Sequence, residues 1–109
     1  MELLIHAASM KGNVNRVRME LASGINPSVP DPCGDTPLHY AAYYARLEVV
    51  QELIAAGADR YIRNNNEQTP KDCIMMVHED GNIVNEEEFL QIVTLLDEEE
   101  IQIKEPGAE

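Results

Sequence analysis

The sequence predicts an all-α solenoid, in which short helix pairs stack on one another. Sequence motifs recur at an offset of 33 residues, and each period contains two short helical patterns. Helices this short cannot bury their apolar faces alone, so the periods must stack to form a core. A chain of 109 residues, 44% hydrophobic and 26% charged, has the composition of one small soluble domain.

The repeat is clearest in a Thr-Pro pair. Thr36-Pro37 recurs as Thr69-Pro70, and the same step of 33 residues taken backwards relates His39 to His6. Other pairs keep this register: Ala41 with Ala8, Leu47 with Val14, Val50 with Val17, Ile54 with Leu21, Gly57 with Gly24, and Asp59 with Asn26. We therefore place one repeat domain over residues 1–96, with repeats at about 1–30, 31–63 and 64–96.

Each period contains two helices. Thr36 can cap a helix that begins at Pro37, where a missing backbone N–H loses no hydrogen bond. A second helix follows, and Gly57 stands where a residue in the left-handed conformation would end it. The apolar positions are Leu38, Ala41 and Ala42 in the first helix, and Leu47, Val50, Leu53 and Ile54 in the second.

Residues 31–59 closely resemble the consensus of the ankyrin repeat family. The matching motifs are Thr-Pro-Leu-His-x-Ala-Ala at 36–42, Glu-Val-Val at 48–50 and Gly-Ala-Asp at 57–59. The resemblance implies antiparallel helix pairs joined by projecting hairpins, with an L-shaped cross-section. It also implies a concave face that binds other proteins.

The chain departs from the family pattern in all three repeats. Repeat one lacks the opening loop and the Thr-Pro pair, which suits a terminal capping repeat. In repeat two, Ala45 replaces the usual Gly, so a positive φ there would cost up to about 1 kcal/mol. The second helix of repeat two has an apolar stripe at Val50, Leu53 and Ile54. In repeat three, the counterparts of this stripe lie 42 residues on, at Ile92, Leu95 and Leu96. About nine residues are therefore inserted, near 76–85.

A last helix is predicted over about 86–96. Residues 79–82 form a turn signal, and Asn85 can cap the helix with Glu88 as its capping-box partner. The acidic residues 97–100 oppose the negative end of the helix dipole, so we expect the helix to stop near Leu96. Residues 97–109 are acidic, and residues 104–109 lack the apolar side chains to pack, which predicts a disordered tail over 97–109.

The same segment resembles part of an EF-hand. Residues 84–93 are similar to the closing half of its calcium loop, with Glu88 at the place of the bidentate ligand. Counting back places Val77 at the first ligand position, where a carboxylate is required, and Asn82 at the invariant glycine. We therefore favour a capped acidic helix over a calcium site.

The net charge excludes several classes of function. The chain has 20 acidic and 8 basic side chains, a formal net charge of -12, and residues 64–109 hold 13 of those acids and 2 of the bases. This charge disfavours nucleic acids and anionic membranes, and favours a protein partner with a basic surface. With two cysteines and no targeting signal, we expect free thiols, a cytoplasmic or nuclear location, and no metal or cofactor.

Residue types that suit catalysis have simpler structural interpretations. His39 and His6 are predicted to be buried hydrogen-bonding residues between repeats. Cys33, His39 and Asp35 are the residue types of a thiol-nucleophile triad, but the family register places Cys33 at a hairpin tip and His39 at a helix base. Cys73 is expected in the core, and residues 78–80 in a solvated loop. We therefore expect no enzymatic activity.

The candidate binding residues cluster around one repeat. All four tyrosines fall within residues 31–63, and the resemblance places Tyr43 and Tyr44 in the concave groove. Alternatively, one of these two tyrosines packs against a neighbouring inner helix. By the same register, the other candidate contacts are Pro32, Cys33 and Asp35, then Asn65, Asn66 and Gln68, and Met10, Lys11, Met76 and Val77 on the inner helices.

Two functions follow, and we expect a monomer in either case. The favoured function is a small adaptor or inhibitor that binds a protein partner through the groove and hairpin tips. The alternative is an acidic mimic or sequestering factor, which acts through its acidic C-terminal half on a basic partner surface. A third possibility is a module whose third repeat is completed by a partner chain.

Overall fold

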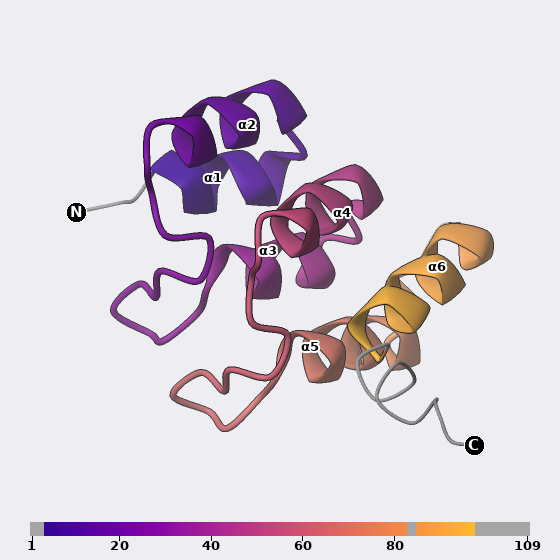
Figure 1. The fold of residues 1–109 in the computed structure, drawn as a ribbon. Coiled ribbons are helices and arrows are strands. Elements are labelled where there is room, and N and C mark those ends of the chain that lie inside the picture. Colours follow the sequence, from indigo (N-terminus) through magenta and orange to yellow (C-terminus); the bar gives the residue numbers. More distant parts are fainter. Residues whose placement is uncertain (1–3, 83–84, 98–109) are drawn as a thin grey trace, which may run out of the picture.

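The computed structural model describes residues 4–82 and 85–97. Within them the chain forms six α-helices, arranged as three stacked pairs (Figure 1), which confirms the all-α solenoid. Helices α1, α3 and α5 form an inner layer, because α3 packs against both α1 and α5, and helices α2, α4 and α6 form the outer layer. The helices are α1 (Leu4–Lys11), α2 (Val14–Ala22), α3 (Pro37–Tyr43), α4 (Leu47–Ala55), α5 (Pro70–Glu79) and α6 (Glu86–Leu96).

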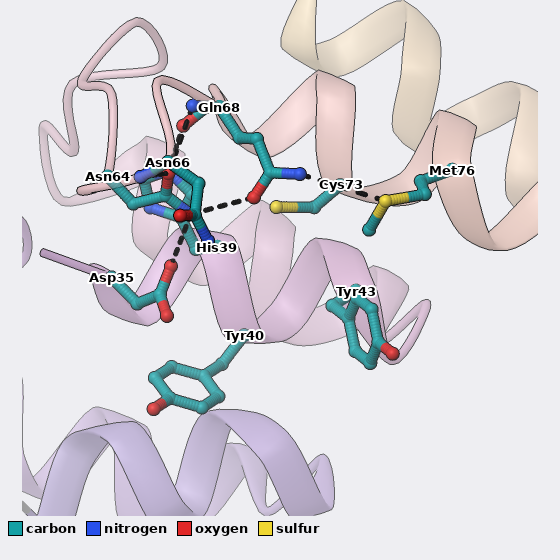
Figure 2. Close-up of a pocket in the computed structure, with 9 residues that line it drawn as sticks. All are labelled: Asp35, His39, Tyr40, Tyr43, Asn64, Asn66, Gln68, Cys73 and Met76. Carbon is teal, nitrogen blue, oxygen red and sulfur yellow. Dashed lines mark hydrogen bonds between the residues drawn. The ribbon is translucent and has the colours of Figure 1, made fainter. Parts of the chain in front are cut away.

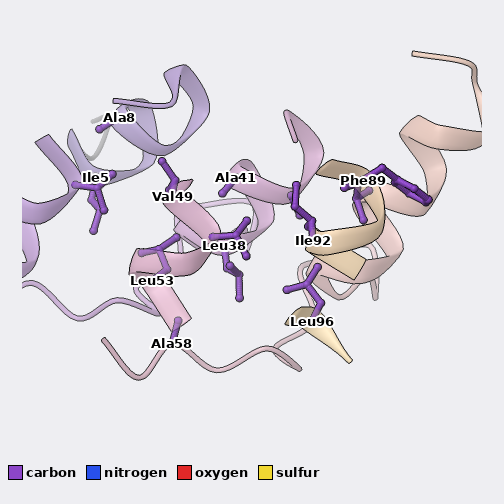
Figure 3. Packing of buried hydrophobic residues seen from close by; sticks show 14 residues of the cluster. Ile5, Ala8, Leu38, Ala41, Val49, Leu53, Ala58, Phe89, Ile92 and Leu96 are labelled. Carbon is purple, nitrogen blue, oxygen red and sulfur yellow. The ribbon is translucent and has the colours of Figure 1, made fainter. Parts of the chain in front are cut away.

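The core lies between the two layers and runs through all three pairs (Figure 3). In α3, Ala41 and Ala42 are fully buried, since small side chains let neighbouring helices approach closely. The largest fully buried apolar side chains come from every pair. They are Ile5, Val17, Leu38, Val49, Val50, Leu53, Ile74, Ile92 and Leu96.

The helix ends follow the predicted capping pattern. Thr36 caps α3 with Pro37 at its first position, and Thr69 caps α5 in the same way. The His39 side chain completes the capping box of α3, a role that the sequence pattern did not reveal. Ala45 has a φ of 55°, as its alignment with glycine predicts, and Gly57 follows α4 with a φ of 94°.

Two hairpins project from the same side of the stack (Figure 1). The first spans residues 31–35 and the second spans 64–68, each closed by a hydrogen bond between its end residues. The buried histidines fasten them: His6 Nε2 donates to the carbonyl oxygen of Asp35 at 3.0 Å, and His39 Nε2 to that of Gln68 at 2.8 Å. The predicted role of both histidines is thereby confirmed.

The insertion lengthens α5, the inner helix of the third pair. Helix α5 has 10 residues where α3 has 7, and it ends at the turn predicted over 79–82, with Gly81 at a φ of 76°. The Oδ1 atom of Asn85 accepts a hydrogen bond from the backbone N–H of Glu88, but within residues 85–97 the reciprocal half of the capping box is absent. Near the end of α5, the His78 ring stacks on the Phe89 ring, with the two ring centroids 4.0 Å apart. The Nε2 atom of His78 lies 2.6 Å from a carboxylate oxygen of Glu86.

Helix α6 covers the end of the core. It ends at Leu96, as predicted, with Ile92 and Leu96 buried. The third member of the predicted stripe, Leu95, is only half-buried against the core, and Phe89 is the third buried residue of this helix face. Asp97 follows the helix and pairs with Lys71 at 3.0 Å. The remainder of the predicted tail, residues 98–109, lies outside the described residues.

Candidate functional site

Tyr43 and Tyr44 stand together at the C-terminal end of α3. Each is 43% exposed, and their rings meet edge to face with centroids 5.0 Å apart and planes at 78°. Helix α3 ends here because Ala45 adopts a positive φ, which turns the chain towards α4. Two adjacent tyrosines that are both nearly half exposed form a stiff, amphipathic surface of the kind enriched in binding hot spots.

A first hollow, here called the hairpin pocket, lies between α3 and the second hairpin (Figure 2). Its volume is about 190 Å³. Asn64, which is buried, donates hydrogen bonds to Asp35 at 2.8 Å and to the side chain of Gln68 at 3.1 Å, so its polar wall is internally paired. The lining residues are Asp35, His39, Tyr40, Tyr43, Asn64, Asn66, Gln68, Cys73 and Met76.

A second hollow, here called the insertion pocket, adjoins the first through Tyr43, which lines both. Its volume is about 390 Å³. Tyr43 and Tyr44 contribute aromatic surface, and the segment around the insertion contributes two carboxylates and two amides. The lining residues are Tyr43, Tyr44, Ala45, Val77, Asp80, Asn82, Asn85 and Glu88.

The structure brings about half of the candidate contact residues together around these pockets. Five line the hairpin pocket: Asp35, Tyr43, Asn66, Gln68 and Met76, the last being 39% exposed. Tyr43, Tyr44 and Val77 line the insertion pocket, and Val77 is buried with only 8% of its surface exposed. Lys11 lines a separate hollow beside Gly12 and Arg46, and Met10, Pro32, Cys33 and Asn65 line neither pocket.

The four remaining candidates, Met10, Pro32, Cys33 and Asn65, use polar groups within the fold. The side chain of Asn65 donates to the carbonyl oxygen of Pro32 at 3.1 Å, and its backbone N–H donates to that of Cys33 at 3.0 Å. These bonds join the tips of the two hairpins. Met10 is half-buried, and its carbonyl oxygen accepts a hydrogen bond from Arg46 at 2.8 Å.

The environments of Cys33, His39 and Cys73 do not suit nucleophilic catalysis. Cys33 is exposed in the first hairpin, whereas His39 is 1% exposed with both ring nitrogens hydrogen-bonded, Nδ1 to Thr36 and Nε2 to Gln68. Cys73 lines the hairpin pocket, but burial raises the pKa of its thiol to about 12. A thiol that is protonated at neutral pH is a poor nucleophile.

The segment that resembles an EF-hand also lacks the required geometry. Val77 lies within α5 and is buried, so the position of the first calcium ligand is helical rather than part of a loop. Asn85 caps α6, and Val84 lies outside the described residues. In residues 4–82 and 85–97, no three His, Cys, Asp or Glu side chains are grouped to hold a metal ion.

Several pocket residues were missed by the sequence analysis. Asp80, Asn82 and Glu88 belong to the insertion or its flank, where the 33-residue register no longer assigns a face. Tyr40 and Asn64 could have been found, because the first lies beside the candidate tyrosines and the second aligns with Asp31 at the head of the preceding repeat.

Comparisons with known proteins agree with this architecture. Residues 5–54 match the family model described as ankyrin repeats in many copies. The chain is 38% identical over 74 residues to oxysterol-binding protein-related protein 1 of Rattus norvegicus, covering 66% of this chain and 8% of that protein. It is 33% identical over 70 residues to protein phosphatase 1 regulatory subunit 27 of Homo sapiens, covering 64% of this chain and 46% of that protein.

A third match is an ankyrin repeat-containing protein of Schizosaccharomyces pombe, 35% identical over 66 residues, covering 61% of this chain and 32% of that protein. The chain therefore spans less than half the length of each of these relatives. None of the helices in the part of the chain that the structure describes is long and apolar enough to span a membrane. The 33-residue repeat, the stacked helix pairs and these matches identify the chain as a member of the ankyrin repeat family.

Proposed function

We propose that this chain is a non-enzymatic protein–protein interaction module, a small adaptor or inhibitor that binds a protein partner through the groove on its concave face and through the hairpin tips. The observation that carries the proposal is the Tyr43–Tyr44 pair, in which each side chain is nearly half exposed. Tyr43 lines both adjoining pockets, and Tyr44 lines the insertion pocket. Met76 adds exposed apolar surface beside this pair. Aromatic residues supply a large contact area at a small cost in conformational entropy.

The state of the polar groups supports a binding role over a catalytic one. His39 has both ring nitrogens engaged in hydrogen bonds, and burial raises the pKa of the Cys73 thiol to about 12. The human relative named above is, by its name, a regulatory subunit of a phosphatase. We propose a role of the same general kind here, in which the chain modulates a partner without performing chemistry itself.

The partner that fits this surface is basic. The formal net charge is -12, and Asp35, Asp80 and Glu88 line the pockets. Long-range attraction would speed association with a positively charged partner and would weaken as salt screens the charges. We therefore propose salt-sensitive association between a monomer of this chain and a basic protein surface.

Affinity capture of a partner from native lysate tests the proposal. Three variants are compared with the wild-type chain: the double change Tyr43→Ala and Tyr44→Ala, a truncation after Leu96, and a control with the double change Met19→Ala and Ile25→Ala. The control side chains are 61% and 38% exposed and belong to α2 and the segment that follows it. Each comparison is made at low and at moderate salt.

The outcomes separate the two functions. If the partner binds in the groove, we expect the tyrosine variant to lose at least about tenfold in affinity for it. The truncation and the control should keep an affinity close to that of the wild type. If the truncation loses the partner while the tyrosine variant keeps it, the groove proposal fails. The acidic C-terminal segment would then be the functional element, as the mimic hypothesis requires.

A further inference from the structure

We propose that the insertion pocket binds an arginine side chain of the protein partner. This inference rests on the proposed function and specifies the chemistry that one pocket recognises. The pocket combines two aromatic rings with two carboxylates in a volume of about 390 Å³. Ligand-binding pockets typically measure about 300–1,000 Å³, whereas the hairpin pocket, at about 190 Å³, is below that range.

The aromatic wall suits a planar cation. Tyr43 and Tyr44 meet edge to face, so the pair offers ring faces in two directions at 78°. A guanidinium stacks on such a face and is attracted by its negative quadrupole. Both rings are 43% exposed and line the pocket, so a ligand can reach them without displacing the core.

The carboxylates supply the complementary charge. Asp80 follows the last residue of α5, Glu88 lies in the first turn of α6, and both line the pocket. Within the described residues, neither carboxylate has a cationic side chain within 4.0 Å. Lys11 and Arg46 line a neighbouring hollow with Glu88, but neither side chain forms an ion pair with the Glu88 carboxylate. The pocket therefore has negative charge that a partner can neutralise.

The polar groups favour arginine over lysine. A guanidinium has five N–H donors in one plane, and it can pair with a carboxylate while it stacks on an aromatic ring. The pocket offers acceptors on Asp80 and Glu88, together with the side-chain amide of Asn82. A lysine ammonium is a compact, strongly hydrated charge that would use fewer of these groups at once.

The insertion is what builds this pocket. Val77, Asp80 and Asn82 come from the extended end of α5 and the turn after it, and Asn85 and Glu88 come from the start of α6. Helix α3 is three residues shorter than α5, so the second repeat has no equivalent of this wall. The insertion therefore acts as a specificity determinant added to a regular solenoid.

The test uses short peptides as defined probes. The full chain, labelled with nitrogen-15, is titrated with a capped Gly-Gly-Arg-Gly-Gly peptide, and matching peptides carry lysine or citrulline in place of arginine. Citrulline has the shape of arginine but is neutral. We expect saturable amide shifts at Tyr44, Ala45, Asp80 and Glu88 with arginine, affinity at least about threefold weaker with lysine, and no saturation with citrulline.

Glu88→Gln and Glu87→Gln form a matched pair of variants. Each removes one negative charge from the first turn of α6, but Glu87 lines a different hollow, beside Gln51 and Leu90. We expect Glu88→Gln and Tyr44→Ala each to weaken the arginine peptide at least about fivefold, and Glu87→Gln to weaken it less than about twofold. Dispersed amide spectra verify that each variant is folded.

The inference is overturned if the arginine peptide gives no saturable shifts, if lysine or citrulline binds as tightly, or if the two glutamate variants weaken binding equally. Its failure is separable from that of the proposed function. Partner capture that depends on Tyr43 and Tyr44, without arginine-peptide binding, would retain the groove function and reject the arginine assignment. Peptide binding without such dependence would reject the groove function.

Discussion

At the scale of single residues, Asp31 holds the first hairpin against helix α3. Its carboxylate accepts hydrogen bonds from the Tyr40 hydroxyl at 2.6 Å and from the backbone N–H groups of Cys33 and Asp35 at 2.9 Å. Partial burial raises the pKa of Asp31, but these hydrogen bonds outweigh that effect and leave the pKa below its ordinary value of 3.8. In turn, the bond to Asp31 raises the pKa of Tyr40.

This shift predicts a specific acid sensitivity. Because the pKa of Asp31 is lower in the folded state, its carboxylate stabilises the fold above the ordinary pKa, and the effect is lost as the pH falls through the folded value. We expect Tyr40→Phe to flatten this loss. The free energy of unfolding, measured by denaturation from pH 7 to about pH 2, should fall less steeply for the variant than for the wild type. Parallel curves would contradict the assignment.

Two residues other than glycine have a positive φ, Ala45 at 55° and Glu67 at 64°. Glu67 is exposed and occupies the position that Gly34 fills in the first hairpin. We expect Glu67→Gly to raise the free energy of unfolding by about 0.5–1 kcal/mol, since glycine adopts this conformation without steric strain. Ala45→Gly should gain less, because the methyl group of Ala45 is half-buried against the core.

Ala7→Gly is the control for this pair. Ala7 lies inside α1, where glycine costs up to about 1 kcal/mol relative to alanine. Chemical denaturation should therefore show a gain in the free energy of unfolding for Glu67→Gly and Ala45→Gly, and a loss for Ala7→Gly. A loss of stability in Glu67→Gly would show that the positive φ is not strained.

At the scale of elements, α6 depends on its cap. Glu86, Glu87 and Glu88 favour the positive end of the helix dipole, and the Asn85 side chain accepts the backbone N–H of Glu88 at 3.0 Å. We expect Asn85→Ala to lower the free energy of unfolding by about 0.5–2 kcal/mol and to speed amide hydrogen exchange in the first turn. Gln91→Ala, at an exposed position within the same helix, should change stability by less than about 0.5 kcal/mol. Equal losses in both variants would reject the cap.

Elements inside the 33-residue register could be predicted from sequence, and those outside it only in part. The Thr-Pro caps, the positive φ of Ala45 and the end of α6 at Leu96 each follow from a local signal. The three extra residues of α5 and the pocket around Asp80 could not be predicted, because an insertion removes the alignment that assigns faces. The buried state of Phe89 was missed for the same reason.

At the scale of the whole molecule, histidines hold successive repeats together. His39 is buried, accepts the backbone N–H of Thr36 at Nδ1 and donates from Nε2 to Gln68 in the next repeat. We expect His39→Ala to lower the free energy of unfolding by about 2–4 kcal/mol, since it leaves buried polar groups unpaired and creates a cavity. His78→Ala removes a partly exposed histidine that stacks on Phe89, and should cost less, about 0.5–1.5 kcal/mol. Equal effects in equilibrium denaturation would contradict this role.

The concave face is the proposed binding surface, and site-specific photo-crosslinking can show whether a partner lies on it. A photoreactive phenylalanine derivative replaces Tyr43 in one protein and Met19 in another, both exposed at the surface. With a captured partner, we expect a covalent adduct from position 43 and little or none from position 19. An adduct from position 19 alone would place the partner on α2 and rule out the concave face as the binding surface.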